Sequence, residues 1–412
     1  MTHPKELQIK DFTYHLPDER IARFPLENRD ASKLLVYQHD QIESSTYASL
    51  TEFLPSGSML VFNDSRVVQA RLLFQKQTGA LIEVFCLEPA DEYPNISTAM
   101  AEVGVVRWKC LIGGASKWKH GLVLEKELQV THTSILLRAS IAERLPDCFV
   151  VAFEWEPKDL SFSQILEVAG SMPLPPYLHR PVETSDRERY QTIYAKHEGS
   201  VAAPTAGLHF TEAIFDSLEQ KGISREFVTL HVSAGTFKPV SASRIADHLM
   251  HAEFIDVDRD TITKIIDRVV EGVIAVGTTS LRTLESLYWI GVKLGSGFAD
   301  PEALAVAQWD PYELHSDVPA KESLQRVVDW MERKNVKRLI TKTSILIAPG
   351  YKLRVAKALI TNFHQPQSTL LLLIAAITGE RWKHLYNYAF ENDFRFLSYG
   401  DGCLLYPTET LG

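Results

Sequence analysis

Four short apolar runs of the sequence each lead into side chains that could bind a substrate or transfer a proton. The runs are residues 59–62, 227–232, 273–276 and 358–360. The polar residues at their ends are Asn63, Asp64 and Arg66, then His231, then Thr278 and Thr279, and last Asn362 and His364. Parallel strands of an α/β fold bind ligands beyond their carboxyl ends. We therefore expect these side chains to surround one ligand site.

The elements that position these residues alternate between strands and helices. Residues 211–221 and 280–290 repeat apolar side chains at helical spacing, and Gly222 follows the first of these segments as a C-terminal cap. A helix that opens at Thr278–Ser280 leaves free N–H groups beside hydroxyls, which suits an anion or a carboxylate. Strands that alternate with helices predict a parallel sheet in an α/β architecture.

Residues 69–156 have a different pattern. Their short alternating runs, 81–87, 108–112, 134–139 and 149–153, are separated by Gly, Asp and Pro, and the stretch contains no long helical pattern. We predict an inserted all-β domain, a small barrel, between the two parts of a discontinuous α/β domain formed by residues 1–68 and 157–412.

Composition excludes several classes of protein. The chain has 412 residues, 43 Lys and Arg against 52 Asp and Glu, and a net charge of −9, which argues against a basic nucleic-acid coat protein. Its four cysteines lack metal or disulfide spacing. The first residues show no apolar leader, and the longest apolar run, 370–377, is too short to span a bilayer. No nucleotide-binding glycine motif occurs. We expect a cytoplasmic enzyme or binding protein.

Two loops hold further candidates, each with two interpretations. In residues 202–210, Pro204 and Gly207 could let the backbone approach a flat ligand, or the segment could be an ordinary helix-entry turn with His209 half buried. In residues 248–253, His248, His251 and Glu253 could form part of a metal site on a helix. The pattern lacks a third ligand and HExxH spacing, so a helix cap or ligand-facing histidines are favoured.

Two basic stretches without acidic residues could form a surface for a polyanion. Residues 333–357 contain eight Lys or Arg and no Asp or Glu. A second stretch interleaves basic residues with Trp108 and Trp118, as nucleic-acid surfaces do. A solvated face is the alternative interpretation. The candidate RNA contacts are Arg107, Lys109, Lys117, Lys119, Lys337, Arg338, Lys352 and Arg354.

Many motifs, in order along nearly the whole chain, resemble the S-adenosylmethionine:tRNA ribosyltransferase-isomerases of queuosine biosynthesis. The resemblance is carried by residues 12–17, 25–32, 61–66, 173–177, 202–210, 228–232, 234–237, 248–253, 277–286, 349–351, 361–370 and 398–401. It implies a distorted α/β barrel with an inserted β-barrel.

The resemblance also implies a reaction. The ribosyl group of S-adenosylmethionine moves to 7-aminomethyl-7-deazaguanine at the tRNA wobble position and is isomerised, giving epoxyqueuosine while adenine and methionine leave. S-Adenosylmethionine is then a consumed substrate, and neither a cofactor nor a metal is expected. The partners would be S-adenosylmethionine and the tRNA anticodon loop, with no membrane, and we expect a monomer.

Such chemistry needs a base beside the sulfonium, a donor for the leaving adenine and donors for the methionine carboxylate. We assign proton transfers to His209, His231 and His251, with Glu253 orienting a histidine. Thr278, Thr279 and Arg282 are assigned to the methionine end or the ribose, and Asn63, Asp64 and Arg66 to the base or the RNA. The remaining substrate-binding candidates are Pro204, Thr205, Gly207, Gly235, Thr236, Asn362, His364, Tyr399 and Asp401.

The chain departs from the family pattern at a few positions. Ser233 replaces a usual Gly, Gln365 a usual Leu, and the acidic segment 285–332 is longer than the usual connection. These departures leave most strand-end polar residues in place but bear on the choice of acceptor. The alternatives are therefore a diverged paralogue that binds RNA without turnover or uses another acceptor, and a metal-dependent hydrolase using His248, His251 and Glu253.

Overall fold

A nine-stranded mixed sheet forms the body of the molecule. The computed structural model describes residues 3–119, 121–130, 133–232, 242–298, 304–314 and 316–408. In spatial order the strands are β16 (Arg338–Thr343), β14 (Glu253–Asp258), β13 (Ser224–His231), β3 (Met59–Asn63), β15 (Val273–Val276), β17 (Ala356–Asn362), β18 (Gly402–Leu405), β1 (Lys33–Gln38) and β2 (Gln41–Thr46). The predicted α/β class is confirmed.

The four apolar runs predicted as strands lie side by side at the centre of this sheet. β13, β3, β15 and β17 are adjacent, and each pairs with its neighbour in parallel. Their carboxyl ends therefore meet at one edge. All five residues of β3 are buried, because the sheet is covered on both faces and neither side of the strand can reach water.

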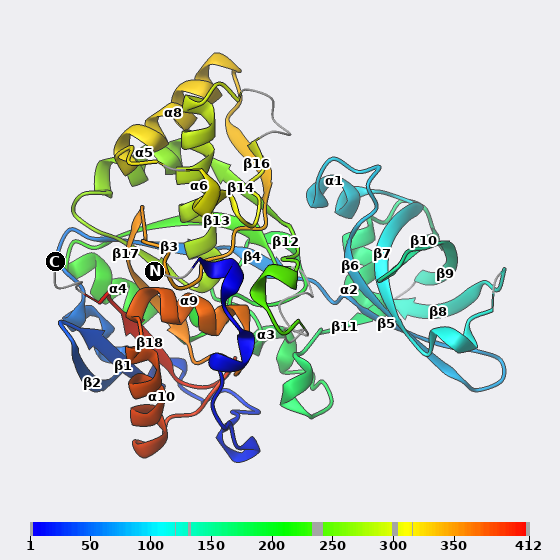
Figure 1. Ribbon diagram of the computed structural model, residues 1–412. Helices are drawn as coiled ribbons and strands as arrows, with labels where there is room; N and C mark the ends of the chain where they lie inside the picture. The colour runs from blue at the N-terminus through cyan, green and yellow to red at the C-terminus, as the bar shows by residue number, and fades with distance from the viewer. Residues whose placement is uncertain are drawn as a thin grey trace.

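Helices cover both faces of the sheet (Figure 1). α6 (Thr278–Gly295) packs against Val61 and Ala275, whereas α4 (Glu212–Gln220) packs against Phe62 and Val276, as the alternation of side chains requires. Gly222 follows α4 with φ +72°, as predicted. The remaining α-helices of the body are α3 (Asp186–Arg189), α5 (Arg259–Arg268), α7 (Asp310–Glu313), α8 (Ala320–Arg333), α9 (Thr369–Thr378) and α10 (Arg381–Glu391).

Short 3₁₀ helices connect many of these elements. They are η1 (Pro4–Glu6), η2 (Ile9–Asp11), η3 (Asp18–Arg20), η4 (Arg29–Ala31), η5 (Tyr47–Phe53), η6 (Ala115–Lys117), η7 (Pro176–Leu178), η8 (Thr205–His209) and η10 (Ile245–Asp247). Among the described residues, no helix is both long enough and apolar enough to cross a membrane.

A second, seven-stranded sheet lies beside the body, drawn mostly in cyan in Figure 1. Neighbouring strands in it pair antiparallel, and the runs predicted as strands fall on β6, β7, β9 and β10. Its core buries Trp108, Trp155 and Phe162 together with side chains of two helices. The order is β11 (Gly170–Ser171), β5 (Arg71–Gln75), β6 (Leu81–Pro89), β7 (Val105–Gly113), β10 (Phe149–Glu156), β9 (Thr133–Arg144) and β8 (Leu124–Val130), with helices α1 (Ile96–Ala101) and α2 (Phe162–Ala169).

The two sheets meet at a tightly packed junction. β12 (His197–Ser200) pairs in parallel with β4 (Ser65–Val67). Gly199 of β12 has φ +129°, and a Cβ atom built there would lie 2.2 Å from Cγ2 of Ile96 on α1 and 3.1 Å from Nδ1 of His231. Phe254 of β14 also packs against the core of the second sheet. The close packing between the two sheets therefore requires a residue without a side chain at position 199.

Candidate active site

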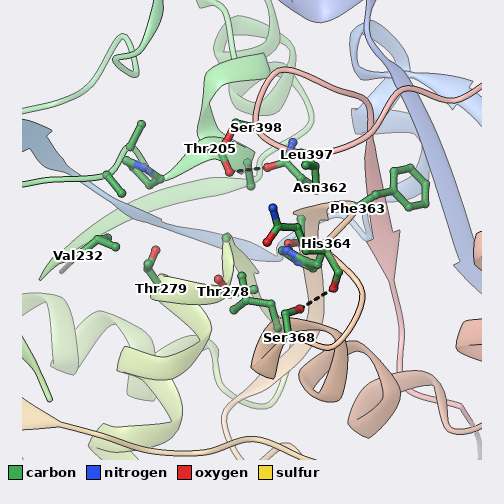
Figure 2. Close-up of a pocket in the computed structure, with 18 of the residues that line it drawn as sticks. Thr205, Val232, Thr278, Thr279, Asn362, Phe363, His364, Ser368, Leu397 and Ser398 are labelled. Atoms are coloured by element: carbon green, nitrogen blue, oxygen red, sulfur yellow. Dashed lines mark hydrogen bonds between the residues drawn. The ribbon is translucent and has the colours of Figure 1, made fainter. Parts of the chain in front are cut away.

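A cavity opens at the carboxyl ends of β13, β15 and β17, where the sequence predicted a ligand site. It holds about 740 Å³ of space, its open mouth included. Of the predicted residues, Pro204, Thr205, Thr278, Thr279, Asn362 and His364 line it. Figure 2 shows Thr278 and Thr279 at the start of α6, facing the same space as Asn362 and His364. The described lining contains no Asp, Glu, Lys or Arg.

The start of α6 offers backbone donors to this cavity. Gly277 precedes the helix with φ +89°, and the helix has no side-chain cap. Ser280 donates its hydroxyl to the carbonyl of Val276 (2.8 Å), which leaves the first N–H groups of the helix without a capping side chain. The positive end of this 18-residue helix suits a carboxylate or another anion.

A buried ion pair lies one turn further along α6. Nη1 of Arg282 donates to Oε2 of Glu253, the first residue of β14. Arg282 is 8 % exposed, and its Nε and Nη2 atoms, like Oγ1 of Thr279, have no hydrogen-bond partner among the described residues. Buried donors without partners cost free energy, so they mark a place where a ligand group can bind.

Among the described residues that line the cavity, His364 supplies the imidazole. Its Nε2 lies 2.9 Å from Oγ1 of Thr361, and its backbone N–H donates to the Tyr386 hydroxyl (3.0 Å). Burial lowers the pKa of His364 to about 3, so the ring is neutral near pH 7. A neutral ring fixed at both backbone and side chain can accept a proton in one defined direction.

His209 lies behind the cavity wall. It is buried, its ring stacks on Tyr47 with centroids 4.3 Å apart, and burial lowers its pKa to about 3. Nδ2 of Asn362 donates to Nε2 of His209 (3.2 Å), while Oδ1 of Asn362 accepts from the Thr205 hydroxyl (2.7 Å). His209 therefore holds Asn362, which in turn faces the cavity.

His231 lies on the other face of β13 from the side chains that reach the cavity. Val232 lines the cavity, whereas His231 and Thr229 point the opposite way, toward Asp64 and the junction of the sheets. Burial lowers the pKa of His231 to about 4, and its Nδ1 has no partner among the described residues.

The polar residues at and just after the end of β3 are mostly engaged within the protein. The Asn63 side chain makes three hydrogen bonds to the backbone, to Leu230 O (2.9 Å), Leu230 N (3.0 Å) and Ser65 N (3.1 Å). Asp64 accepts from the Thr229 hydroxyl (2.7 Å), and burial raises its pKa. Arg66 is exposed, 4.0 Å from Glu198. None of the three lines the cavity described above.

The loop with His248 and His251 does not form the helix on which a metal site was considered. Residues 248–252 follow η10 as an irregular segment that leads into β14, and His251 is exposed. The Gln308 side chain fixes the backbone of this loop: its amide oxygen accepts from Met250 N–H (2.9 Å), and its amide nitrogen donates to the carbonyl of His248 (2.8 Å). Within the described residues, no group of three His, Cys, Asp or Glu could hold a metal ion.

The glycine predicted to admit a flat ligand serves packing instead. A Cβ atom at Gly207 would lie 1.9 Å from the Tyr194 hydroxyl, and Gly207 is not among the described residues that line the cavity. The segment is the 3₁₀ helix η8, and His209 within it is fully buried rather than half buried. Gly235 and Thr236 lie outside the described residues.

The C-terminal motif contributes to the cavity through residues that the sequence did not single out. Ser398 lines the wall and lies 2.5 Å, oxygen to oxygen, from Tyr177, which also lines it, as does Tyr190. The predicted Tyr399 and Asp401 hold this loop from behind: Asp401 accepts from the N–H groups of Lys33 (2.9 Å) and Arg395 (2.7 Å). Tyr177 and Ser398 lie within two of the motifs that carry the family resemblance, residues 173–177 and 398–401, and that membership could have marked them as site residues.

The predicted RNA contacts divide into paired and unpaired groups. Lys109 lies 2.7 Å from Asp91 and Arg107 3.5 Å from Glu92, while Arg338 lies 2.7 Å from Asp256. The guanidinium of Arg354 lies 5.4 Å from the centroid of Tyr288. Four exposed side chains form no ion pair with any described residue: Lys117, Lys119, Lys337 and Lys352.

The two tryptophans within the basic stretch do not form a stacking surface. Trp108 and Trp118 are each 1 % exposed and belong to the core of the second sheet. The alternation of β7 explains this, because it turns Arg107 outward and Trp108 inward. The interpretation of these rings as an RNA platform is therefore wrong.

Comparisons with known proteins define the class. The model of the queuosine biosynthesis protein family matches residues 9–405, so the chain belongs to that family and the resemblance is confirmed. A relative from Pelobacter propionicus, named S-adenosylmethionine:tRNA ribosyltransferase-isomerase, is 35% identical over 406 residues, 96% of this chain and 99% of the relative. The prediction of an enzyme of this family is also confirmed.

The chain is also similar to solved structures. One of them is described as the S-adenosylmethionine tRNA ribosyltransferase from Thermotoga maritima and is 26% identical in sequence. The match covers 96% of this chain and 99% of that chain, with a TM-score of 0.45.

Proposed function

We propose that this protein transfers the ribosyl group of S-adenosylmethionine to 7-aminomethyl-7-deazaguanine at the wobble position of tRNA. The product would be epoxyqueuosine, and adenine and methionine would leave. The observation that carries the proposal is the cavity at the carboxyl ends of the parallel strands, in a chain that matches the named relative over nearly its whole length.

The start of α6 would bind the methionine carboxylate. Its uncapped N–H groups and the hydroxyls of Thr278 and Thr279 face the cavity, and the helix dipole favours negative charge. Arg282, one turn further on, has two guanidinium nitrogens without a described partner and would add a charged donor for the carboxylate or the ribose. Glu253 would hold that guanidinium in place.

His364 would take the proton from the carbon beside the sulfonium. It is the imidazole in the lining, and its low pKa keeps it unprotonated at neutral pH. His209 would support the reaction through Asn362, because Asn362 separates it from the cavity. A proton-transfer role for His231 and His251 stays a prediction. Because neither residue is in the described lining of the cavity, the role would require a substrate that extends beyond that cavity. No metal is needed for these steps.

The acceptor would be the tRNA anticodon loop, bound through exposed cations. Lys117, Lys119, Lys337 and Lys352 are free to contact phosphates, since no described acidic residue neutralises them. Asn63, Asp64 and Arg66 remain predicted contacts of the base or the RNA, with Arg66 the most accessible. A tRNA substrate would place the enzyme in the cytoplasm, and a monomer stays the expected state.

We also propose that the two sheets are barrel-like. The nine-stranded sheet would be a distorted, open barrel, and residues 69–156 would form an inserted barrel domain between residues 1–68 and 157–412. In support, Cα atoms of β5 and β8, which are not neighbours in strand order, come within 8 Å of each other. The short strand β11 lies beyond residue 156 and adds to the same sheet.

The test is a reaction with two measured products. The purified protein is incubated with S-adenosylmethionine and with tRNA that carries 7-aminomethyl-7-deazaguanine, and adenine and the modified nucleoside are followed by mass spectrometry. We expect equal amounts of adenine and epoxyqueuosine. Retained tRNA binding with neither product would contradict the proposal and favour the alternative, a diverged paralogue that binds RNA without turnover or uses another acceptor.

A further inference from the structure

Three hydroxyl groups gather at the end of the cavity away from α6. Tyr177 and Ser398 lie 2.5 Å apart through their hydroxyl oxygens, and Tyr190 lines the same wall. The Tyr190 side chain is fully buried, and its hydroxyl approaches the Ser398 side chain and the Ala203 backbone without a regular hydrogen bond to either. We call Tyr177, Tyr190 and Ser398 the hydroxyl end. In Figure 2, Ser398 lies across the cavity from Thr278 and Thr279.

The loop that carries Ser398 is held rigidly. Leu397 has φ +68°, a backbone conformation that a leucine adopts only when its surroundings impose it. A Cβ atom at Gly400 would lie 2.5 Å from the carbonyl oxygen of Arg395, so the loop is closely packed against its own start. Such a loop fixes the direction of the Ser398 hydroxyl before a ligand arrives.

A second set of contacts holds the loop from the other side. The Tyr399 hydroxyl lies 3.3 Å from Oδ1 of Asp186, and Arg180 binds both carboxylate oxygens of Asp186 at 2.7 and 2.8 Å. The Tyr190 ring packs edge-on against Tyr399 with centroids 5.9 Å apart. The charges of Arg180 and Asp186 are therefore paired behind the wall, and the hydroxyl end itself is uncharged.

These properties fit an uncharged, flat, heteroaromatic ligand. The edge of a purine-type base presents both donors and acceptors, and a hydroxyl group can serve either. Aromatic side chains pack against base faces without regard to sequence. A carboxylate or phosphate would instead favour the start of α6, which supplies N–H donors and the positive end of a helix dipole.

We infer that the hydroxyl end binds a purine-type base, with Tyr190 and the Tyr177–Ser398 pair reading its hydrogen-bonding edge. The inference rests on the proposed function, which supplies two such bases: the adenine of S-adenosylmethionine and the 7-deazaguanine of the tRNA. Both share the chemistry that the wall recognises, and the experiment separates them.

The variants are Tyr190→Phe and Ser398→Ala, with Tyr194→Phe as the matched control. The Tyr194 hydroxyl is also buried and approaches the Thr192 side chain without a regular hydrogen bond, but Tyr194 is not in the described lining of the cavity. Adenosine affinity is measured by calorimetry, and the KM values for S-adenosylmethionine and for tRNA are measured by adenine release. The melting midpoint of each variant is measured without ligand. Each Phe variant removes a buried hydroxyl that lacks a regular hydrogen bond, so neither should lower the melting midpoint.

We expect Tyr190→Phe and Ser398→Ala to weaken base binding about three- to tenfold, the usual effect of one lost hydrogen bond, and Tyr194→Phe to leave it unchanged. Weaker adenosine binding with a raised KM for S-adenosylmethionine identifies the base as adenine. A raised KM for tRNA alone identifies it as the acceptor. Unchanged adenosine affinity and unchanged KM values in both variants of an active enzyme would overturn the inference.

The failure of the proposed function gives a different result. A wild-type protein that binds adenosine but releases no adenine contradicts the proposed function, and the variants still test the inference through adenosine affinity. A wild-type protein with neither adenosine binding nor turnover contradicts both.

Discussion

Nδ2 of Asn362 lies 3.2 Å from Nε2 of His209, and this contact connects a fully buried imidazole to the wall of the cavity. Asn362 is held from its other side by the Thr205 hydroxyl. The amide therefore has one orientation, fixed by a donor on one side and an acceptor on the other. His209 thus holds the cavity-facing amide in place, and its low pKa keeps the ring neutral over the physiological pH range.

His209→Phe should separate positioning from proton transfer. The variant keeps an aromatic ring against Tyr47 but removes the acceptor for Asn362, so we expect kcat to fall by roughly 10-fold or more. Because His209 stays neutral above about pH 3, the shape of the pH–rate profile between pH 6 and 9 should not change. Loss of a limb of that profile would show that His209 transfers a proton. Thr205→Val should decrease kcat to a similar extent. The decreases should not add in the double variant, because both residues act through Asn362.

His364→Gln should abolish most turnover while preserving the fold. Glutamine can still bond the Thr361 hydroxyl but cannot accept the proton, so kcat should fall by roughly 10²- to 10⁴-fold, the usual contribution of a general base. The binding of S-adenosylmethionine should change little. Measured adenine release under single-turnover conditions, with the affinity for S-adenosylmethionine as the control, decides the point; retained turnover would assign the base elsewhere.

Three buried histidines should make the protein unstable in acid. Burial lowers the pKa of His209 and His364 to about 3 and of His231 to about 4, from 6.5. Below pH 6.5 the unfolded chain binds protons that the folded protein does not, so stability is full above that pH and is lost as the pH falls. Each histidine should lower the free energy of unfolding by up to about 1.4 kcal/mol per pH unit.

Urea unfolding between pH 7 and 5 measures this dependence. His231→Gln should reduce the slope by up to about 1.4 kcal/mol per pH unit, since one of the three buried groups is gone. His384→Gln, at an exposed position, is the control and should leave the slope unchanged. Equal slopes in the wild type and His231→Gln would contradict the assignment.

Glu285 ties α6 to the segment that precedes β17, and its removal should weaken the fold. Its fully buried carboxylate accepts from the Tyr351 hydroxyl (2.5 Å) and from the N–H groups of Arg354, Val355 and Ala356 (2.8–3.1 Å). Glu285→Gln places an amide donor against these donors, and should cost about 2–4 kcal/mol of unfolding free energy. The control, Glu322→Gln, breaks an exposed pair with Arg326 and should cost less than about 1 kcal/mol.

Lys337→Ala should weaken tRNA binding through the loss of one phosphate contact. Lys337 is exposed and forms no ion pair with the described residues, so the slope of log affinity against log salt should fall by about 1. Lys264→Ala serves as the control, because Lys264 is paired with Glu226 at 2.7 Å. Equal slopes for the wild type and Lys337→Ala would place the RNA elsewhere.

The order of elements and the place of the cavity could be predicted because they depend on local patterns. Apolar runs bounded by polar residues located β13, β3, β15 and β17, and parallel pairing then brought their ends together. Thr278, Asn362 and His364 follow directly from that geometry, since each lies at or just beyond a strand end.

It was harder to predict on which face of a strand an individual side chain lies. His231 and Val232 are neighbours in sequence, yet only Val232 reaches the cavity, because a strand turns successive side chains to opposite faces. The interpretation of Trp108 as part of a nucleic-acid surface was wrong for the same reason. Tyr177, Tyr190 and Ser398 come from segments more than 200 residues apart, and no pattern within either segment indicates their contact.

The missing side chain at Gly199 has a consequence for how such an enzyme can diverge. Ile96 of α1 occupies the space that a methyl group at position 199 would take, and His231 at the end of β13 borders that space closely. A larger residue there would push α1 away from β13 and change how the two sheets are placed relative to each other. A single substitution at position 199 could thus change the relative placement of the two sheets without replacing any of the described residues that line the cavity.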